Sequence, residues 1–324
     1  ETVEKMAKYG LLGIPFPTKY GGMGGDEVSY SITVSELAKV CASTSVIVSA
    51  HTSLCCWPIY KYGTEDQKMK YLPELLSGKK LGAFGLTEPN AGTDASGQQT
   101  RAELDGDEWV LNGAKCFITN GGYAEVFVVM AMTDKSKGNH GISAFIVEKN
   151  DPGFSIGKTE DKMGICASST TELIFQNCRI PKDRLLGGLG KGFKVAMQTL
   201  DGGRIGIASQ ALGIAEGALE VTIEYMKQRK QFGKKLAQMQ ALQFVVADLA
   251  TKVEAAKLLV LKSAFCEDAG LPYGVPAAMA KLFAAETAME VTTKCVQLHG
   301  GYGYTKDYPV ERMMRDAKIT EIYE

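Results

Sequence analysis

The spacing of apolar residues changes twice along this chain. Up to about residue 80 it follows the period of α-helices, and residues 37–49 form one long, largely apolar helical stretch. The glycines of residues 21–25 predict a turn-rich connection before that stretch. Thr64, followed by Glu-Asp-Gln, has the sequence of a helix N-cap and predicts a helix that continues to Leu76. Residues 1–80 are therefore expected to form an N-terminal helical domain.

A period of two replaces the helical spacing at residue 81 and continues to about residue 186. Apolar and polar residues alternate there in short runs that are bounded by turn residues. The predicted strands are 81–86, 109–111, 126–130, 142–147 and 172–175. The predicted turns are 112–113, 120–122, 137–139 and 151–153, where Asn, Asp, Gly or Pro cluster. Residues 81–186 are expected to form a small, central antiparallel β domain or barrel.

Helical spacing returns at residue 187. The apolar positions predict three long helices, at about 193–223, 237–265 and 276–298. Short connections marked by Gly or Pro join them, which is typical of a helical bundle. The predicted fold class is therefore α+β, with an N-terminal helical domain, a central antiparallel β domain and a C-terminal helical bundle over residues 187–324.

Length, charge and cysteine usage argue against several classes of protein. The 324 residues can bury a substantial core, and a net charge of −1 gives no reason to expect nucleic acid or an anionic membrane as a partner. No apolar run approaches the roughly 20 residues that span a bilayer, so we expect a soluble protein. The eight cysteines are scattered without a CxxC pair, and the three histidines lie far from one another in the sequence. We expect free thiols in a reducing compartment and no metal site.

Two Gly-rich stretches suggest the chemistry. Residues 85–97, GLTEPNAGTDASG, have the composition of an exposed loop whose backbone N–H groups and hydroxyls approach a ligand. On composition alone, a plain connecting loop is about equally favoured. Residues 297–316 read QLHGGYGYTKDYPVERMMRD. The two stretches resemble the first and the C-terminal signatures of the acyl-CoA dehydrogenase family. The resemblance covers essentially the whole chain and is strongest to short-chain, butyryl-CoA-type members.

The resemblance implies a flavin-dependent enzyme. It implies that the chain binds FAD, oxidises a short, straight acyl-CoA to the trans-2-enoyl-CoA, and passes electrons to an electron-transfer flavoprotein. The sequence is consistent with this, because no G-x-G-x-x-G motif of a nicotinamide-binding fold follows a strand and no P-loop is present. The alternatives are an acyl-CoA oxidase, a branched-chain acyl-CoA dehydrogenase, and, from another class, a non-catalytic flavin- or CoA-binding fragment.

Glu324 is the catalytic base that the resemblance implies. In the family's Ile-Tyr-Glu-Gly-Thr motif the Glu removes the α-proton, and residues 322–324 carry the Ile-Tyr-Glu part of it. By itself, a glutamate at this position would be interpreted as a solvated chain end. Isovaleryl-type relatives place the base directly before an Arg of the first bundle helix. Gly203 stands before Arg204 here, so that alternative carboxylate is absent.

The resemblance also assigns the remaining site residues. It implies that Thr93, Asp201 and Arg204 contact the acyl-CoA. Without it, Asp201 and Arg204 would be interpreted as an ion pair one helical turn apart, Arg229 as part of a cationic helix C-terminus, and Phe117 as a core residue. The residues implied to bind FAD are Phe84, Leu86, Thr87, Gly92, Thr93, Phe117, Ile118, Thr119, Arg229, Gln231, Phe232, Gln240, Gln297, Leu298, Gly300 and Gly301.

Oligomeric state and compartment follow from the resemblance as well. In relatives the residues around Arg229 and Gln297 reach a FAD that is held mainly by the neighbouring subunit, which implies a dimer at least and a dimer of dimers by analogy. Compared with the family, a leading helical piece and a closing helix are expected to be missing from this sequence. A bacterial cytoplasm is the expected compartment, or the mitochondrial matrix if the source is eukaryotic. Trp57 and His299 are expected to be packing residues.

Overall fold

Contacts within the chain fall into two units. The computed structural model describes residues 1–324. Unit 1 comprises residues 1–26, 47–161 and 168–203, and unit 2 comprises residues 27–46, 162–167 and 204–324. Each unit therefore contains segments that are far apart in the sequence.

One helix of unit 1, α5, begins where the N-cap signal predicts. Gln67 donates its backbone N–H to Thr64 Oγ1 over 3.2 Å, and Gln67 Oε1 accepts from the Thr64 N–H over 3.0 Å. This reciprocal pair is a capping box, and it starts α5 at the predicted residue. Apolar residues of this part, including Leu72 and Leu75, are fully buried. Its helices are α1 (Thr2–Lys8), the end of α3 (Ala42–Ser49), a π-helix (Ala50–Cys56), α4 (Trp57–Tyr62) and α5 (Glu65–Leu76).

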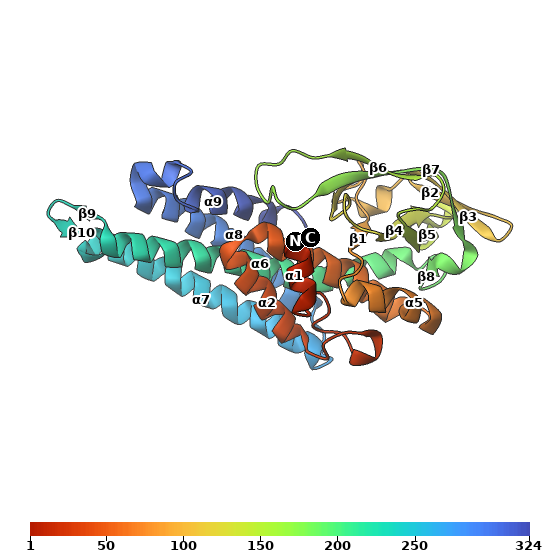
Figure 1. Cartoon of the computed structure of the whole chain (residues 1–324), viewed down its shortest axis with the longest axis horizontal. Coiled ribbons are helices and arrows are strands. Elements are labelled where there is room, and N and C mark those ends of the chain that lie inside the picture. The colour runs from red at the N-terminus through yellow and green to blue at the C-terminus, as the bar shows by residue number, and fades with distance from the viewer. The chain divides into compact units, whose positions relative to one another are not determined.

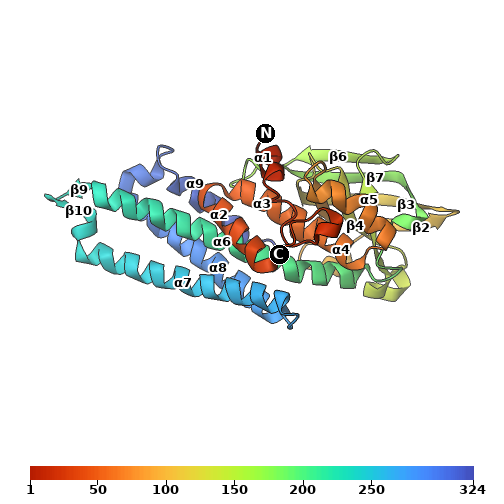
Figure 2. The same ribbon diagram turned by 60° about the horizontal axis from the view of Figure 1, so that its bottom comes forward.

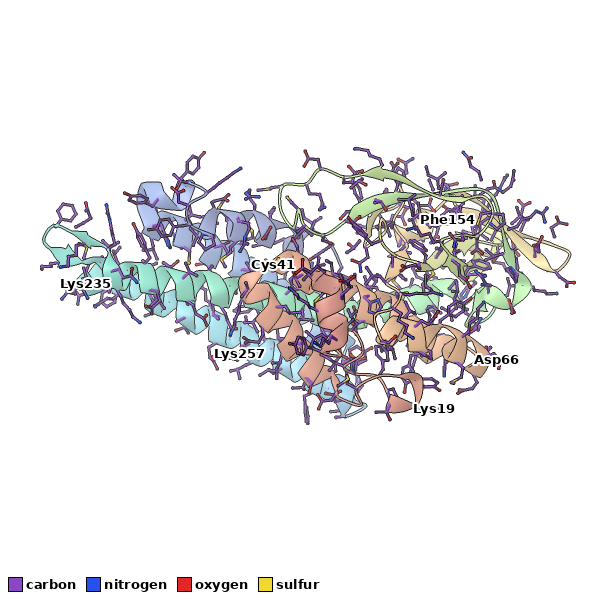
Figure 3. The ribbon with its side chains drawn as sticks, in the orientation of Figure 1. Lys19, Cys41, Asp66, Phe154, Lys235 and Lys257 are labelled. Carbon is purple, nitrogen blue, oxygen red and sulfur yellow. The ribbon has the colours of Figure 1, made fainter.

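An eight-stranded sheet forms the rest of unit 1, where the alternating pattern predicts it (Figure 1). Most neighbouring strands are antiparallel, whereas β1 pairs with β4 in parallel. Phe154 packs against Phe127 and Phe175, with ring centroids 4.9 and 5.3 Å apart, and is labelled among the strands in Figure 3. The strands are β1 (Gly82–Gly85), β2 (Arg101–Asp105), β3 (Glu108–Thr119), β4 (Val126–Met132), β5 (Ile142–Glu148), β6 (Phe154–Thr159), β7 (Thr170–Pro181) and β8 (Leu185–Leu186).

The turn predicted at residues 112–113 is wrong, because both residues lie inside β3. The register against β7 shifts between Leu111 and Gly113, which marks a bulge. Gly113 has a φ of +143°, and a Cβ atom there would lie 2.6 Å from Thr100 Oγ1. The glycine therefore admits a neighbouring strand to close range and does not reverse the chain.

Unit 2 contains the three long helices that the apolar spacing predicts. They are seen side by side in Figures 1 and 2. Buried alanines such as Ala208, Ala256 and Ala284 dominate the core that they share. Small side chains allow helix axes to approach closely, which suits straight, tightly packed helices. The helices of unit 2 are α2 (Glu27–Val40), α6 (Gly192–Gln228, of which residues 204–228 belong to this unit), α7 (Gln240–Asp268), α8 (Gly274–His299) and α9 (Val310–Lys318).

The cationic segment begins where α6 ends, as the sequence predicts, and the Arg229 N–H donates to the Tyr225 oxygen over 2.9 Å. The chain forms a two-stranded hairpin from β9 (Lys230–Gln231) and β10 (Lys234–Lys235), and Figure 3 labels Lys235 there. Phe232 and Gly233 have φ values of 52° and 71°, as a tight two-residue hairpin turn requires. Phe232 is 93% exposed. None of the helices combines the length and hydropathy that a bilayer-crossing segment needs.

The capping box at Thr64 gives a prediction on stability. Thr64→Ala should lower the free energy of unfolding by about 1 kcal/mol, because it removes the acceptor for the Gln67 N–H. Urea unfolding measures the change. Thr64→Ser keeps the hydroxyl and is expected to stay close to the parent protein; equal losses for Ala and Ser would contradict the capping role.

Candidate active site

Glu324 lies in a cavity of unit 2 with a volume of about 540 Å³. Its Oε2 atom is buried and has no hydrogen-bond partner. Burial raises the pKa of Glu324 to about 8, and the charges of Arg204 and Lys281 act in the opposite direction. Glu324 as a residue is half-buried, and its one buried oxygen is shielded from water and available for a proton. The other residues that line this cavity are Ala278, Leu282, Ala285, Glu286 and Glu321.

Contacts with α6 hold the segment that carries Glu324. Arg204 donates from Nε to the backbone oxygen of Glu324 over 3.2 Å. The Tyr323 hydroxyl donates to Gln210 Oε1, and Gln210 donates from Nε2 to the backbone oxygen of Ala42 over 2.9 Å. Gln210 is fully buried, so this chain of hydrogen bonds is shielded from water. Arg204 therefore acts twice, as a charge beside the carboxyl and as a backbone anchor.

A second cavity of unit 2, of about 580 Å³, brings together most of the cofactor residues predicted there. Arg229 lies at its edge, where its guanidinium carbon is 5.2 Å from the ring centre of Tyr302. The predicted residues that line the cavity are Arg229, Gln231, Gln297, Leu298, Gly300 and Gly301. Phe232 and Gln240 are not among the lining residues, because Phe232 is at the exposed tip of the hairpin and Gln240 begins α7.

The donors of this cavity suit a phosphate-bearing ligand. A Cβ atom at Gly300 or Gly301 would meet no atom within 4 Å, so a ligand can reach the backbone there. The Arg229 guanidinium is a fork of donors that matches phosphate oxygens. His299 lines the cavity, and its buried Nε2 atom has no partner. Its Nδ1 lies 2.9 Å from the backbone oxygen of Cys295, so Nε2 is an acceptor in the neutral ring. The ring therefore adds no donor for a phosphate, and the donors of the cavity are the Arg229 guanidinium and the open backbone at the glycines.

In unit 1, the predicted flavin residues lie on β1, on the loop that follows it and on β3. Phe117 is 64% exposed and has a φ of 58°. The register of β3 against β7 shifts between Lys115 and Ile118, so Phe117 sits on a bulge that turns its ring out of the sheet. The alternative interpretation of Phe117 as a core residue is wrong. Ile118, in contrast, is buried in the sheet core.

The loop itself is attached to β3 by a backbone hydrogen bond. The Cys116 N–H donates to the Thr87 oxygen over 2.9 Å. Phe84 and Leu86 are buried in the core beneath the loop, whereas Gly92 and Thr93 are exposed. The side chains of Phe84 and Leu86 are part of the apolar core. Gly92 and Thr93 expose backbone and hydroxyl groups that a ligand can contact.

The predicted substrate residues are divided between the units. Thr93 and Asp201 belong to unit 1 and Arg204 belongs to unit 2, since the unit boundary falls inside α6 after Gly203. A Cβ atom at Gly202 would meet nothing within 4 Å, so the helix surface is open at this residue.

Two features of the site were missed from the sequence. Lys281 contributes a charge beside Glu324, but a lysine on a long helix gives no signal that distinguishes it from a solvated one. Lys115 and Glu88 form a fully buried ion pair beneath the loop. Glu88 lies within the first Gly-rich stretch, and the alternation of β3 was the signal that could have placed Lys115 inside.

Comparison with known proteins identifies the family. Three models of acyl-CoA dehydrogenase domains match the chain: the N-terminal domain over residues 1–79, the middle domain over residues 83–178 and the C-terminal domain over residues 190–324. The chain belongs to the acyl-CoA dehydrogenase family. This is a family of flavin-dependent oxidoreductases whose members bind FAD. The predicted resemblance and fold class are thereby confirmed.

Individual relatives are similar over the whole chain. The short-chain specific acyl-CoA dehydrogenase of Clostridium acetobutylicum is 63% identical over 324 residues, which are 100% of this chain and 86% of the relative. The structure of butyryl-CoA dehydrogenase from Megasphaera elsdenii has a TM-score of 0.98 and 57% identity. The matched region covers 99% of this chain and 85% of the M. elsdenii chain. A solved structure reported for the electron transferring flavoprotein of Acidaminococcus fermentans has a TM-score of 0.98 and 60% identity. The matched region covers 99% of this chain and 84% of that chain.

The cavity around Glu324 gives a prediction on its titration. Lys281→Met should raise the pKa of Glu324 above its value of about 8, because a neighbouring cation favours the charged carboxylate. The carboxyl resonance of ¹³C-labelled glutamate, followed against pH in the free protein, measures the shift. Lys281→Arg keeps the charge and should leave the pKa in place, as should Lys294→Met at an exposed residue of the same helix. An unchanged or lower pKa in Lys281→Met would show that the charge does not reach the carboxyl.

Proposed function

We propose that this chain is an FAD-dependent dehydrogenase of short, straight-chain acyl-CoA thioesters such as butyryl-CoA, with the trans-2-enoyl-CoA as product. The observation that carries the proposal is the Glu324 carboxyl, desolvated and with an unpartnered oxygen, at the end of a chain segment that matches the family's C-terminal domain. The similar proteins from C. acetobutylicum and M. elsdenii, named for short-chain substrates and butyryl-CoA, support the chain length.

Glu324 removes the α-proton of the thioester. That proton is only weakly acidic, so the base needs a raised pKa and a site that excludes water. Burial of its Oε2 atom raises the pKa of Glu324, and Arg204 and Lys281 stabilise the carboxylate that must exist before the transfer. FAD, when bound, supplies the acceptor for the hydride that leaves Cβ. Gly203 offers no competing carboxylate at the position used by isovaleryl-type enzymes.

The remaining site residues keep the roles that the family pattern implies. Arg229 binds the pyrophosphate of FAD, and open backbone at Gly300 lets the dinucleotide approach. Thr93, Asp201 and Arg204 line the acyl-CoA site. The other FAD contacts are Phe84, Leu86, Thr87, Gly92, Thr93, Phe117, Ile118, Thr119, Gln231, Phe232, Gln240, Gln297, Leu298 and Gly301.

The partners follow from the same proposal. The FAD residues of unit 2 serve a cofactor held mainly by a second copy of the chain, so the active assembly is a dimer at least and a dimer of dimers by analogy. Reduced FAD passes its electrons to an electron-transfer flavoprotein, which the solved structure from A. fermentans supports. We place the protein in a bacterial cytoplasm, or in the mitochondrial matrix if its source is eukaryotic.

The three-part division of the chain at residues 80 and 186 is supported by the ranges that the family models match.

The alternatives differ in how well they are supported. A non-catalytic flavin- or CoA-binding fragment is not supported, because relatives that are similar over the full chain are dehydrogenases. A branched-chain dehydrogenase of the isovaleryl type is disfavoured by Gly203. An acyl-CoA oxidase differs from the proposed enzyme in its electron acceptor. The two are distinguished by comparing how fast air and the electron-transfer flavoprotein reoxidise the reduced flavin.

The proposed reaction predicts a substrate profile. Under anaerobic conditions the FAD-loaded protein should bleach fastest with butyryl-CoA in a panel from C4 to C8. Glu324→Gln should reduce the rate of bleaching by about 10² or more, because a general base contributes at least that factor. Stopped-flow absorbance measures both. A folded, yellow parent protein that no member of the panel bleaches would contradict the proposal.

The cofactor cavity predicts an affinity change. Arg229→Ala should weaken FAD binding at least tenfold, corresponding to about 1.4 kcal/mol, since a charge-assisted bond to phosphate is lost. Fluorescence titration of the apoprotein with FAD gives the dissociation constant. Lys230→Ala removes a neighbouring cation that does not line the cavity and serves as the matched control. Equal effects of the two variants would point to net charge and exclude a specific phosphate contact.

A further inference from the structure

Lys115 is a lysine whose ammonium is wholly removed from water. Its side chain is 0% exposed, and that of its partner Glu88 is 5% exposed. The Lys115 Nζ atom donates to three acceptors: Glu88 Oε1 over 2.7 Å, the Leu86 oxygen over 3.1 Å and Gln98 Oε1 over 3.1 Å. An ammonium has three N–H donors, so none is left unpaired.

The Glu88 carboxylate also accepts hydrogen bonds from backbone N–H groups. One carboxylate oxygen accepts from the Gln99 N–H over 2.5 Å, and the other accepts from the Thr100 N–H over 3.0 Å. With Lys115, the carboxylate thus receives three hydrogen bonds without contact with water. Burial lowers the pKa of Lys115 to about 8, against the attraction of Glu88, whose own pKa is lowered by the lysine.

The pair joins the two ends of the loop after β1. Leu86 and Glu88 are on its first side, and residues 98–100 are on its return. The Thr100 hydroxyl continues the connection to the Ala114 oxygen on β3, over 3.2 Å. Lys115 itself directly precedes Cys116, whose N–H holds Thr87, and the bulge at Phe117. One buried side chain therefore ties together both segments to which flavin contacts are assigned.

We infer that the buried Lys115–Glu88 pair is a positioning device that fixes the Thr87 loop and the Phe117 bulge in the geometry that FAD requires. This rests on the proposed function for the identity of the ligand. Neither side chain is a catalytic residue, since both are covered by the loop. A buried pair is weak evidence for stability, because an apolar pair of similar volume can stabilise as well. Its value here is geometric: the polar partners fix where Leu86, Glu88 and Gln98 must lie.

The same unit contains a matched pair for comparison. Arg184 binds Asp151 over 2.8 Å with both side chains 9% exposed, and Arg184 also binds Glu148 over 3.0 Å. This pair joins β5, its following turn and the segment before β8, none of which carries a predicted flavin contact. Its loss should affect folding in the same way as loss of Lys115, without moving the flavin loop.

The test compares Lys115→Met, the double variant Lys115→Met with Glu88→Met, and Arg184→Met. Urea unfolding, FAD titration and the visible spectrum of the bound flavin are measured for each. Lys115→Met and Arg184→Met should both lower stability. We expect FAD affinity to fall at least tenfold, with an altered flavin spectrum, in Lys115→Met and also in the double variant, in which stability recovers because no charge remains buried alone. Arg184→Met should keep the parent affinity and spectrum.

A second readout needs no cofactor. In the apoprotein, amide hydrogen exchange at Cys116, whose acceptor Thr87 is unchanged in every variant, should accelerate in both Lys115 variants and stay at the parent rate in Arg184→Met. Exchange at Gln99 and Thr100 is compared only in Lys115→Met, which keeps Glu88 as their acceptor. Recovery of FAD affinity, spectrum and exchange along with stability in the double variant would overturn the positioning role. A parent protein that fails to bind FAD would instead refute the proposed function. The exchange data would still show whether the Lys115–Glu88 pair holds the loop.

Discussion

The cost of removing charged groups from water is the constraint on which this site depends. A buried charge must be neutralised by partners or must shift its pKa toward the neutral form. The protein uses both solutions. Lys115 and Glu88 are buried with all the donors of the ammonium paired. Glu324 keeps a buried oxygen without a partner, and its pKa rises to about 8. We assign a positioning role to the first arrangement, and we propose that the second serves as the base of the reaction.

The environment of Glu324 is a balance of opposing effects. Burial favours the protonated carboxyl, whereas the nearby cations favour the carboxylate that a base needs, and the resulting pKa is about 8. Arg204 and Lys281 oppose desolvation without forming a close ion pair with the unpartnered oxygen. A base with a pKa near the working pH combines a populated carboxylate with a strong affinity for the proton. The cavity around Glu324 therefore gives this glutamate the raised pKa that the proposed role as a base requires.

Much of the fold was predictable, because the signals are local. The Thr64 cap and the helical spacing of the bundle depend on neighbours within a few residues, and the structure confirms both. The errors arise where distant residues decide. Gly113 was assigned to a turn because Asn-Gly favours one, but the approach of Thr100 makes it a bulge. The sequence places the end of α6 correctly, but it does not predict the hairpin of residues 230–235, whose turn requires positive φ at Phe232 and Gly233.

The site was predictable only as far as its motifs extend. Family patterns placed Glu324 and Arg229, and the structure puts each in a cavity. Lys281 and Lys115 carry no motif, because their importance comes from burial and from partners on other elements. Phe117 shows the same limit: alternation suggests an inward side chain, and only the shift in register reveals that it faces outward.

Exchange of the substrate's α-proton with solvent tests the role of Glu324 most directly. The FAD-loaded protein is incubated anaerobically with butyryl-CoA in D₂O, without an electron acceptor, and deuterium at C2 is measured by mass spectrometry. The account predicts rapid incorporation by the parent protein and none above the uncatalysed background by a Glu324→Gln variant that still binds FAD. Incorporation at the parent rate by that variant would show that another group removes the proton.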